Sequence, residues 1–156
     1  MGAVIGIDPG LTGAVAVIAH GQTVVHDMPV IGTSTTATVK RSVDAHGLAR
    51  ILKIMPGTVW IERVNAFPGQ GVASMFSLGH SFGVALGVAA ALGYPTHLVN
   101  PAEWKRFFKL GKDKELSRAL ASRLYPGVKL DRMKDHGRAE ALLIARYGAL
   151  SGGVLC

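Results

Sequence analysis

Two acidic residues of this sequence stand where apolar runs typical of buried strands come to an end. The chain carries ten Asp and Glu among its 156 residues. Asp8 follows the apolar run 3–7, and Glu62 follows the run 58–61. A carboxylate in such surroundings needs a partner or a metal ion, because an uncompensated buried charge is costly. Both residues are therefore candidates for a site at the ends of strands, where α/β sheets commonly bind ligands.

A second pair of acids, Asp135 and Glu140, flanks the start of a helix predicted over 136–150. Because each helical residue adds about 100° of rotation, His136 and Glu140 share a face, whereas Asp135 converges with Glu140 only if it precedes the helix. Each acid alone has an ordinary alternative. Asp8 could form a turn, Asp135 could be an N-cap, and Glu140 could be a solvated helix residue.

Several carboxylates around one point would form a site for divalent cations. Their mutual repulsion has to be neutralised, and ligands that are all oxygen suit Mg²⁺ or Mn²⁺ rather than zinc. Two such ions about 4 Å apart are a known arrangement for in-line attack on a phosphodiester. The chemistry indicated by Asp8, Glu62 and an acid of the last helix is therefore hydrolysis of a phosphodiester bond, with two Mg²⁺ or Mn²⁺ ions as cofactor.

The elements that must position these residues follow from apolar periodicity and from turn residues. Strands are predicted over 3–7, 14–19, 23–26, 58–61 and 96–99, the first three forming an antiparallel meander. Helices are predicted over 44–54, 71–92, 101–110, 114–125 and 136–150, and the polar stretch 33–38 is predicted to be a loop. The pattern predicts a single α/β domain over residues 1–156, with a five-stranded mixed sheet and helices on both faces.

Charge and composition favour a polyanionic partner. Lys and Arg number 17 against ten Asp and Glu, which leaves a net charge of +7, and a hydrophobic content of 49% excludes intrinsic disorder. The basic residues concentrate in the second half of the chain, where the alternative is a solvated face balanced by nearby acids. Those singled out are Lys105, Arg106, Lys109, Lys112, Lys134 and Arg138.

Cysteine usage and hydropathy bear on location. The single cysteine, Cys156, excludes a disulfide framework and a cysteine-based zinc cluster, so a cytoplasmic location is expected. No charged residue occurs between 64 and 102, yet the most apolar part, 84–92, is too short to span a bilayer. We therefore expect no membrane segment.

The segment 6–13, GIDPGLTG, resembles the first motif of the RuvC family of Holliday-junction resolvases. Glu62 after an apolar strand, a glycine-rich helix and a late acidic helix with ALLIA at 141–145 are similar too, and 68–76 resembles the phage and prophage branch. The resemblance covers nearly the whole chain. It implies a ribonuclease H-like fold, a homodimer, and resolution of four-way DNA junctions by paired symmetric nicks, with no helicase partner indicated.

Three alternatives to a junction resolvase follow from the same residues. A non-catalytic nucleic-acid-binding protein and a ribonuclease H acting on RNA–DNA hybrids would share the fold. An actin-like kinase would need a second lobe, for which the chain is too short, and the sequence has no phosphate-binding Gly-Lys-Ser/Thr loop.

By the resemblance, Asp8 and Glu62 match the first two catalytic metal ligands and Glu140 matches the last. The common bacterial form has two aspartates three residues apart, and three residues before Glu140 this chain has Gly137. Asp135 and His136 are the candidates for the missing position. Asp135 is favoured as the metal ligand, and His136 is an alternative ligand or a proton shuttle.

The resemblance also implies contacts with DNA and with a second subunit. Phe67 is the candidate for a wedge in the opened junction centre, Gln70 and Ser74 for backbone contacts, and the six basic residues above for phosphate contacts. The helix predicted over 71–92 is the candidate dimer interface, through Met75, Leu78, Phe82 and Leu86. Its glycines at 79, 83 and 87 favour close packing, on the sheet or on a second subunit, and the apolar face could instead be core.

Overall fold

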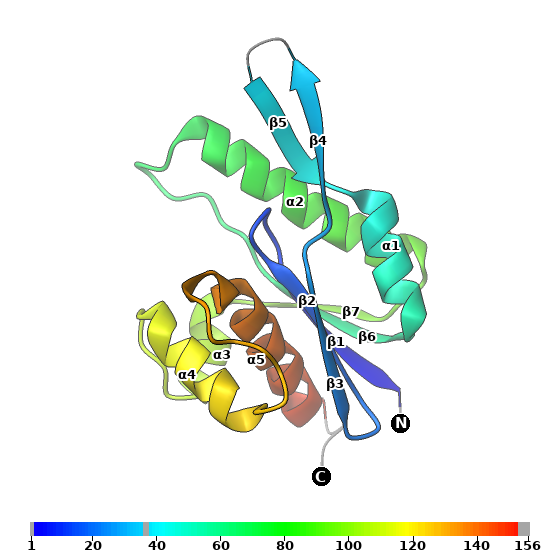
Figure 1. Cartoon of the computed structure of the whole chain (residues 1–156), viewed down its shortest axis with the longest axis vertical. Coiled ribbons are helices and arrows are strands. Elements are labelled where there is room, and N and C mark those ends of the chain that lie inside the picture. Colours follow the sequence, from blue (N-terminus) through cyan, green and yellow to red (C-terminus); the bar gives the residue numbers. More distant parts are fainter. Residues whose placement is uncertain (1, 36–37, 153–156) are drawn as a thin grey trace.

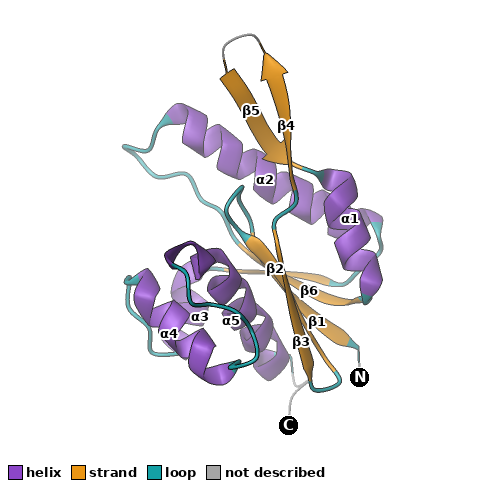
Figure 2. Cartoon of the chain, viewed as in Figure 1, coloured by secondary structure: helices purple, strands orange, loops and turns teal. Residues whose placement is uncertain are grey.

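A five-stranded mixed sheet forms the centre of the structure. The computed structural model describes residues 2–35 and 38–152, so Cys156 lies outside the described residues. The strands of this sheet are β1 (Ala3–Asp8), β2 (Ala14–Ala19), β3 (Gln22–Asp27), β6 (Gly57–Glu62) and β7 (Thr96–Val99). They lie in the order β3-β2-β1-β6-β7 (Figures 1 and 2). β2 pairs antiparallel with both β1 and β3, whereas β6 pairs parallel with both β1 and β7. This arrangement confirms the predicted meander and the predicted mixed sheet.

Helices cover both faces of the sheet, as predicted. α1 (Ala45–Ile54) and α2 (Val72–Ala91) lie on one face, and α3 (Pro101–Phe107), α4 (Lys114–Leu124) and α5 (His136–Ser151) on the other (Figure 1). The short helical turn η1 (Met133–Asp135) leads directly into α5. Each face has its own apolar core, with Ile5 and Leu48 in one and Trp104 and Leu142 in the other.

The segment predicted to be a loop over 33–38 belongs to a β-hairpin. Its strands are β4 (Val30–Thr35) and β5 (Thr38–Val43), which pair only with each other and project from the body of the molecule (Figure 1). The loop prediction is therefore wrong for 33–35 and for 38, while 36 and 37 lie outside the described residues. Its polar composition suggested a loop, but threonine is β-branched and favours a paired strand.

Helix α5 packs directly onto β1 because glycine stands at two points of contact. A Cβ added at Gly6 of β1 would collide with the backbone of Ala141 and Ala145 in α5. A Cβ added at Gly137 would collide with the carbonyl oxygen of Thr12 in the turn after β1. Both glycines therefore allow α5 to approach closely, and this approach brings the start of α5 to the end of β1.

Helix α2 turns its glycines away from the sheet. A Cβ added at Gly79, Gly83 or Gly87 would meet no atom within 4 Å, so packing of these glycines on the protein's own sheet is excluded. Phe82 and Leu86 instead pack against the core under α2. This agrees with the alternative prediction that the apolar face of this helix belongs to the core of the chain rather than to a dimer interface. Among the described residues, α2 is the one helix whose length and apolarity would suffice to cross a membrane.

Candidate active site

Three carboxylates meet at one edge of the sheet. β1 and β6 are parallel neighbours, so Asp8 and Glu62, their last residues, emerge side by side. Glu140 reaches the same point from the second turn of α5, which the close contact with β1 holds in place. One oxygen of each carboxylate lies within 4.8 Å of the other two. The structure thus brings together three of the four predicted metal ligands.

Burial and like charge act together on this cluster. The pKa of Asp8 is raised well above its usual value, first by burial and then by the neighbouring Glu140 and Glu62. The pKa of Glu62 is also raised, mainly by burial, and a hydrogen bond from Trp104 opposes the rise. Lys105 and Lys114 lower both pKa values without cancelling the rise. A cation bound among the three carboxylates would therefore stabilise the ionised form of each one.

Two residues of α3 hold these carboxylates in position. The indole Nε1–H of Trp104 donates to Glu62 Oε2 at 2.7 Å, and Trp104 is completely buried. Lys105 places its Nζ 3.8 Å from Glu140 Oε1 and 5.2 Å from the centre of the Trp104 ring. A buried indole N–H needs an acceptor. This role of Trp104 was not predicted from the sequence, although a tryptophan next to the candidate Lys105 was a usable signal.

The donor set fits a divalent cation. Glu140 Oε1 is buried and accepts no hydrogen bond from any residue that the structure describes, because Lys105 Nζ at 3.8 Å is beyond hydrogen-bonding distance. A buried carboxylate oxygen without a donor is costly unless something else binds it. The three residues offer only oxygen ligands, which Mg²⁺ and Mn²⁺ prefer. Asp8, Glu62 and Glu140 are therefore the residues that could hold a metal ion.

Asp135, the favoured fourth ligand, does not join this cluster. Its carboxylate accepts from Arg132, at 2.7 Å from Nη2 and 2.9 Å from the backbone N–H, and it is 1% exposed. These hydrogen bonds lower the pKa of Asp135. The Nε of Arg138 also lies 3.9 Å from Asp135 Oδ1. Asp135 therefore does not lie in the metal cluster as predicted, because the η1 turn points its carboxylate toward two arginines instead.

His136 and Gly137 follow Asp135 at the start of α5. His136 lines a cavity of about 200 Å³ together with Asp8 and Glu140, and its Nε2 lies 2.8 Å from Glu115 Oε1. Gly137 has no room for a side chain, since an added Cβ would collide with the Thr12 carbonyl oxygen. An aspartate at position 137, as in the common bacterial form, would not fit. Of the two candidates for the missing position, His136 rather than Asp135 therefore shares a cavity with Asp8 and Glu140.

A cavity of about 690 Å³ opens in front of the three carboxylates. Phe67, which is 61% exposed, lies at this cavity in the loop after β6. Gln70 of the same loop accepts a hydrogen bond from the Phe67 backbone N–H at 3.3 Å. The other predicted contact residues that line this cavity are Ser74 and Lys105, and Lys114 joins them there.

The remaining basic residues divide into two groups. Arg106, Lys109 and Lys112 line a neighbouring cavity of about 530 Å³, which Lys105 joins to the carboxylate cavity. Lys134 is exposed beside His136, whereas Arg138 donates two hydrogen bonds to Asp27, at 2.7 and 3.0 Å. Arg138 and Lys105 therefore have acidic partners within the chain, whereas Arg106, Lys109, Lys112 and Lys134 are exposed.

Comparison with known proteins identifies the class first. RuvC of Thermus thermophilus in complex with Holliday junction substrate has a TM-score of 0.68 to this structure, with 18% identity over 99% of this chain and 97% of that one. A second Thermus thermophilus RuvC structure gives a TM-score of 0.60, with 20% identity over 96% of each chain. The fold is ribonuclease H-like, and its carboxylate cluster makes the chain a candidate metal-dependent phosphodiesterase.

Sequence relatives then give the family. The crossover junction endodeoxyribonuclease RuvC of Leifsonia xyli is 31% identical over 160 aligned positions, which cover 97% of this chain and 75% of that protein. The chain therefore belongs to the RuvC family. The chloroplast Holliday junction resolvase MOC1 of Chlamydomonas reinhardtii is 35% identical over 92 residues, 56% of this chain but only 10% of that much longer protein. No family model matches the chain.

Proposed function

We propose that this protein is a metal-dependent endodeoxyribonuclease that resolves four-way DNA junctions by paired symmetric nicks. The observation that carries the proposal is the cluster of Asp8, Glu62 and Glu140, whose oxygens lie within 4.8 Å of one another at a cavity of about 690 Å³. Membership of the RuvC family supports this choice of substrate, as does the likeness to a RuvC structure that contains a Holliday junction.

The three carboxylates would hold Mg²⁺ or Mn²⁺, two ions per site. Bound there, such ions activate water and stabilise charge on the leaving oxygen of a phosphodiester. Trp104 orients Glu62, and Lys105 and Lys114 offset part of the negative charge. His136, which faces the same carboxylates across the small cavity, is placed to hold a proton near the attacked phosphate.

The exposed residues around the cavity fit a DNA strand. Phe67 offers an aromatic face for stacking on a base of the opened junction, and Gln70 and Ser74 lie beside it for backbone contacts. The basic residues of the adjoining cavity are suited to phosphates, a contact that gives affinity without sequence reading. These residues are Lys105, Arg106, Lys109 and Lys112.

The open face of α2 supports a homodimer. Val72 and Phe76 are 86% and 75% exposed, and they lie at the start of the helix that carries the open glycines. An apolar helix face of this kind favours a covering partner. We expect this partner to be a second copy of the chain, because paired nicks in a junction with two-fold symmetry need two matched active sites.

Cleavage of a synthetic four-way junction tests the function. With Mg²⁺ or Mn²⁺, the native protein is expected to nick two opposite strands, and Asp8→Asn to bind the junction but to cut it about 1,000-fold more slowly. A linear duplex and an RNA–DNA hybrid serve as competing substrates. Binding without nicking by the native protein would favour a non-catalytic junction-binding protein, and preferential cutting of the hybrid would favour a ribonuclease H.

A further inference from the structure

A further cavity of about 270 Å³ lies between the base of the β4–β5 hairpin and the η1 turn. Arg41 of β5 lines one side, and Arg132 and Lys134 line the other. None of the three is a metal ligand, and the hairpin has no role in the chemistry proposed above. Three cationic side chains from two separate parts of the chain thus line one concave surface.

The acids of this cavity are already paired, which leaves a positive excess. Asp27 accepts two hydrogen bonds from Arg138, and Asp135 accepts from Arg132. Within residues 2–35 and 38–152, neither Arg41 nor Lys134 lies within ion-pairing distance of a carboxylate. A cavity with two unpaired cations attracts an anion, and a guanidinium beside an ammonium suits a phosphate group.

The cavity shares lining residues with the two cavities at the carboxylate cluster. Lys134 also lines the small cavity that contains Asp8, His136 and Glu140, and Thr12 of the turn after β1 lines all three cavities. Phe67 lies in the carboxylate cavity but in neither of the others. A strand whose phosphate reaches the carboxylates can therefore continue past Lys134 toward Arg41.

We propose that this cavity binds a backbone phosphate of the DNA arm next to the cleaved strand, so that the hairpin and the η1 turn grip the arm between Arg41 and Lys134. The proposal rests on the proposed function, since it concerns how the same substrate is held. The contact is to the phosphodiester group and carries no sequence preference.

Binding measurements at several salt concentrations test this site. In the Asp8→Asn background, Arg41→Gln combined with Lys134→Gln is expected to weaken junction binding about tenfold, equivalent to about 1.4 kcal/mol. The plot of log affinity against log salt is expected to become shallower by about one. Arg41→Lys, which keeps the charge, should retain the slope.

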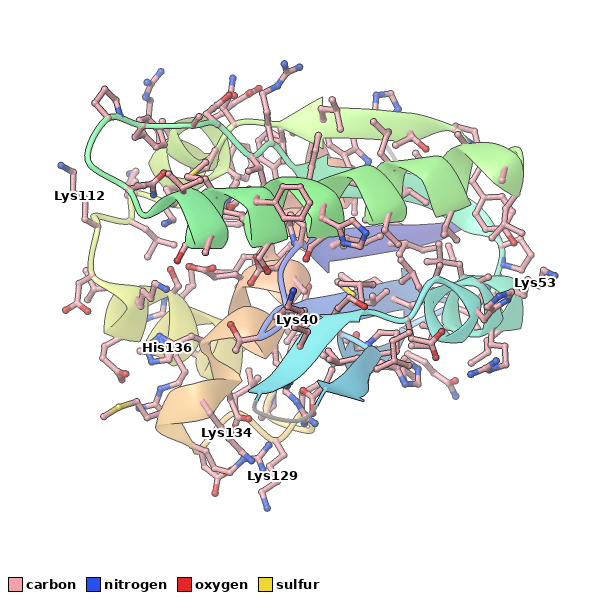
Figure 3. All side chains as sticks on the ribbon, turned by 90° about the horizontal axis from the view of Figure 1, so that it is seen from above. Lys40, Lys53, Lys112, Lys129, Lys134 and His136 are labelled. Carbon is pink, nitrogen blue, oxygen red and sulfur yellow. The ribbon has the colours of Figure 1, made fainter. Side chains whose placement is uncertain are left out.

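The matched control is Lys53→Gln, an exposed lysine near the end of α1 that Figure 3 shows well apart from Lys134 and His136. It removes one positive charge without touching the cavity. Equal weakening by Lys53→Gln would overturn the site, because a general loss of charge would then explain the effect. Native-like affinity and slope in the Arg41 and Lys134 variants would overturn it while junction cleavage still stands. Failure of the native protein to bind or cut junctions would instead reject the proposed function.

Discussion

At the scale of single residues, the carboxylate cluster opposes folding when no metal is present. Because the folded state raises the pKa of Asp8 above its unfolded value, the protonated carboxyl is the form that the fold favours. Stability contributed in this way is complete below the unfolded pKa and is lost as the pH rises through the folded pKa. The metal-free protein therefore carries its greatest electrostatic penalty at neutral and alkaline pH.

Asp8→Asn removes this penalty. We expect the metal-free variant to melt several degrees above the native protein at pH 7.5, and the difference to shrink toward pH 4. Mg²⁺ or Mn²⁺ should then raise the melting temperature of the native protein and leave that of the variant almost unchanged, because one ligand is missing. Thermal unfolding with EDTA or metal, at both pH values, measures the effect. A variant that is less stable than the native protein at pH 7.5 would show that the cluster is not repulsive.

The positions of these residues in space could be predicted from the sequence only where the end of a strand or the face of a helix determines them. Asp8 and Glu62 could be placed together because each ends a strand, and parallel strands end at the same edge. Glu140 was recognised as a late helical acid. Asp135 could not be assigned correctly, because its contacts depend on the fold of the η1 turn, which brings the arginine three residues earlier back onto its carboxylate. Nothing in sequence spacing distinguishes that ion pair from metal ligation.

At the scale of elements, the junction of η1 and α5 depends on the ion pair of Asp135 with Arg132. Arg132 lowers the pKa of Asp135, so the stabilisation is present above the unfolded pKa and is lost as the pH falls through the folded pKa. Asp135→Asn is expected to cost about 2 kcal/mol at pH 7, a typical loss for hydrogen bonds to a charged group. In a chain of this size that lowers the melting temperature by about 6 °C. The cost should diminish below about pH 4.

Glu140→Gln is the matched variant on the same segment. It exchanges a carboxylate for an amide in the same way, but at a residue of the metal cluster. We expect Asp135→Asn to lose stability and retain junction cleavage at a temperature where it stays folded, and Glu140→Gln to lose cleavage and retain stability. Thermal unfolding and initial rates of nicking measure both. If Asp135→Asn were folded but unable to cleave, our assignment of Asp135 to a structural role would be wrong.

The order and type of the main elements could be predicted from sequence because apolar periodicity and turn residues report them directly. The two-residue turn His20–Gly21 illustrates this, since both residues have positive φ, as a tight hairpin requires. The β4–β5 hairpin could not be predicted, because it lies outside the main sheet and lacks the apolar alternation that packing on a core imposes. Its strands are defined by pairing with each other.

At the scale of the whole molecule, the open face of α2 is the feature that a single chain leaves unexplained. One side of this helix packs on the core through Phe82, while Gly79, Gly83 and Gly87 face outward with free space around them. Glycine lowers the stability of an exposed helix by about 1 kcal/mol relative to alanine. Three glycines spaced four residues apart on one face allow another helix to approach closely. This is the arrangement proposed for the homodimer.

Gly83→Glu separates the dimer from the fold of the chain. A Cβ at this position meets no described atom within 4 Å in the single chain, and glutamate is a better helix former than glycine by about 0.5 kcal/mol or more, so the monomer should be at least as stable as before. In a dimer packed through this face, a buried charge would be placed at the contact. We therefore expect the native protein to sediment at twice 16.4 kDa and Gly83→Glu at 16.4 kDa.

Ala119→Glu, on the exposed side of α4, is the control for added charge and should remain dimeric and active. Because each nick needs one active site and resolution needs two, Gly83→Glu should convert paired nicks into single, uncoordinated ones. Sedimentation and a plasmid-borne junction, in which linear and nicked products are distinguished, measure both effects. If the native protein were monomeric in solution and bound lipid vesicles through α2, this face would be a membrane contact instead. If Gly83→Glu were still a dimer, the subunit contact would lie elsewhere.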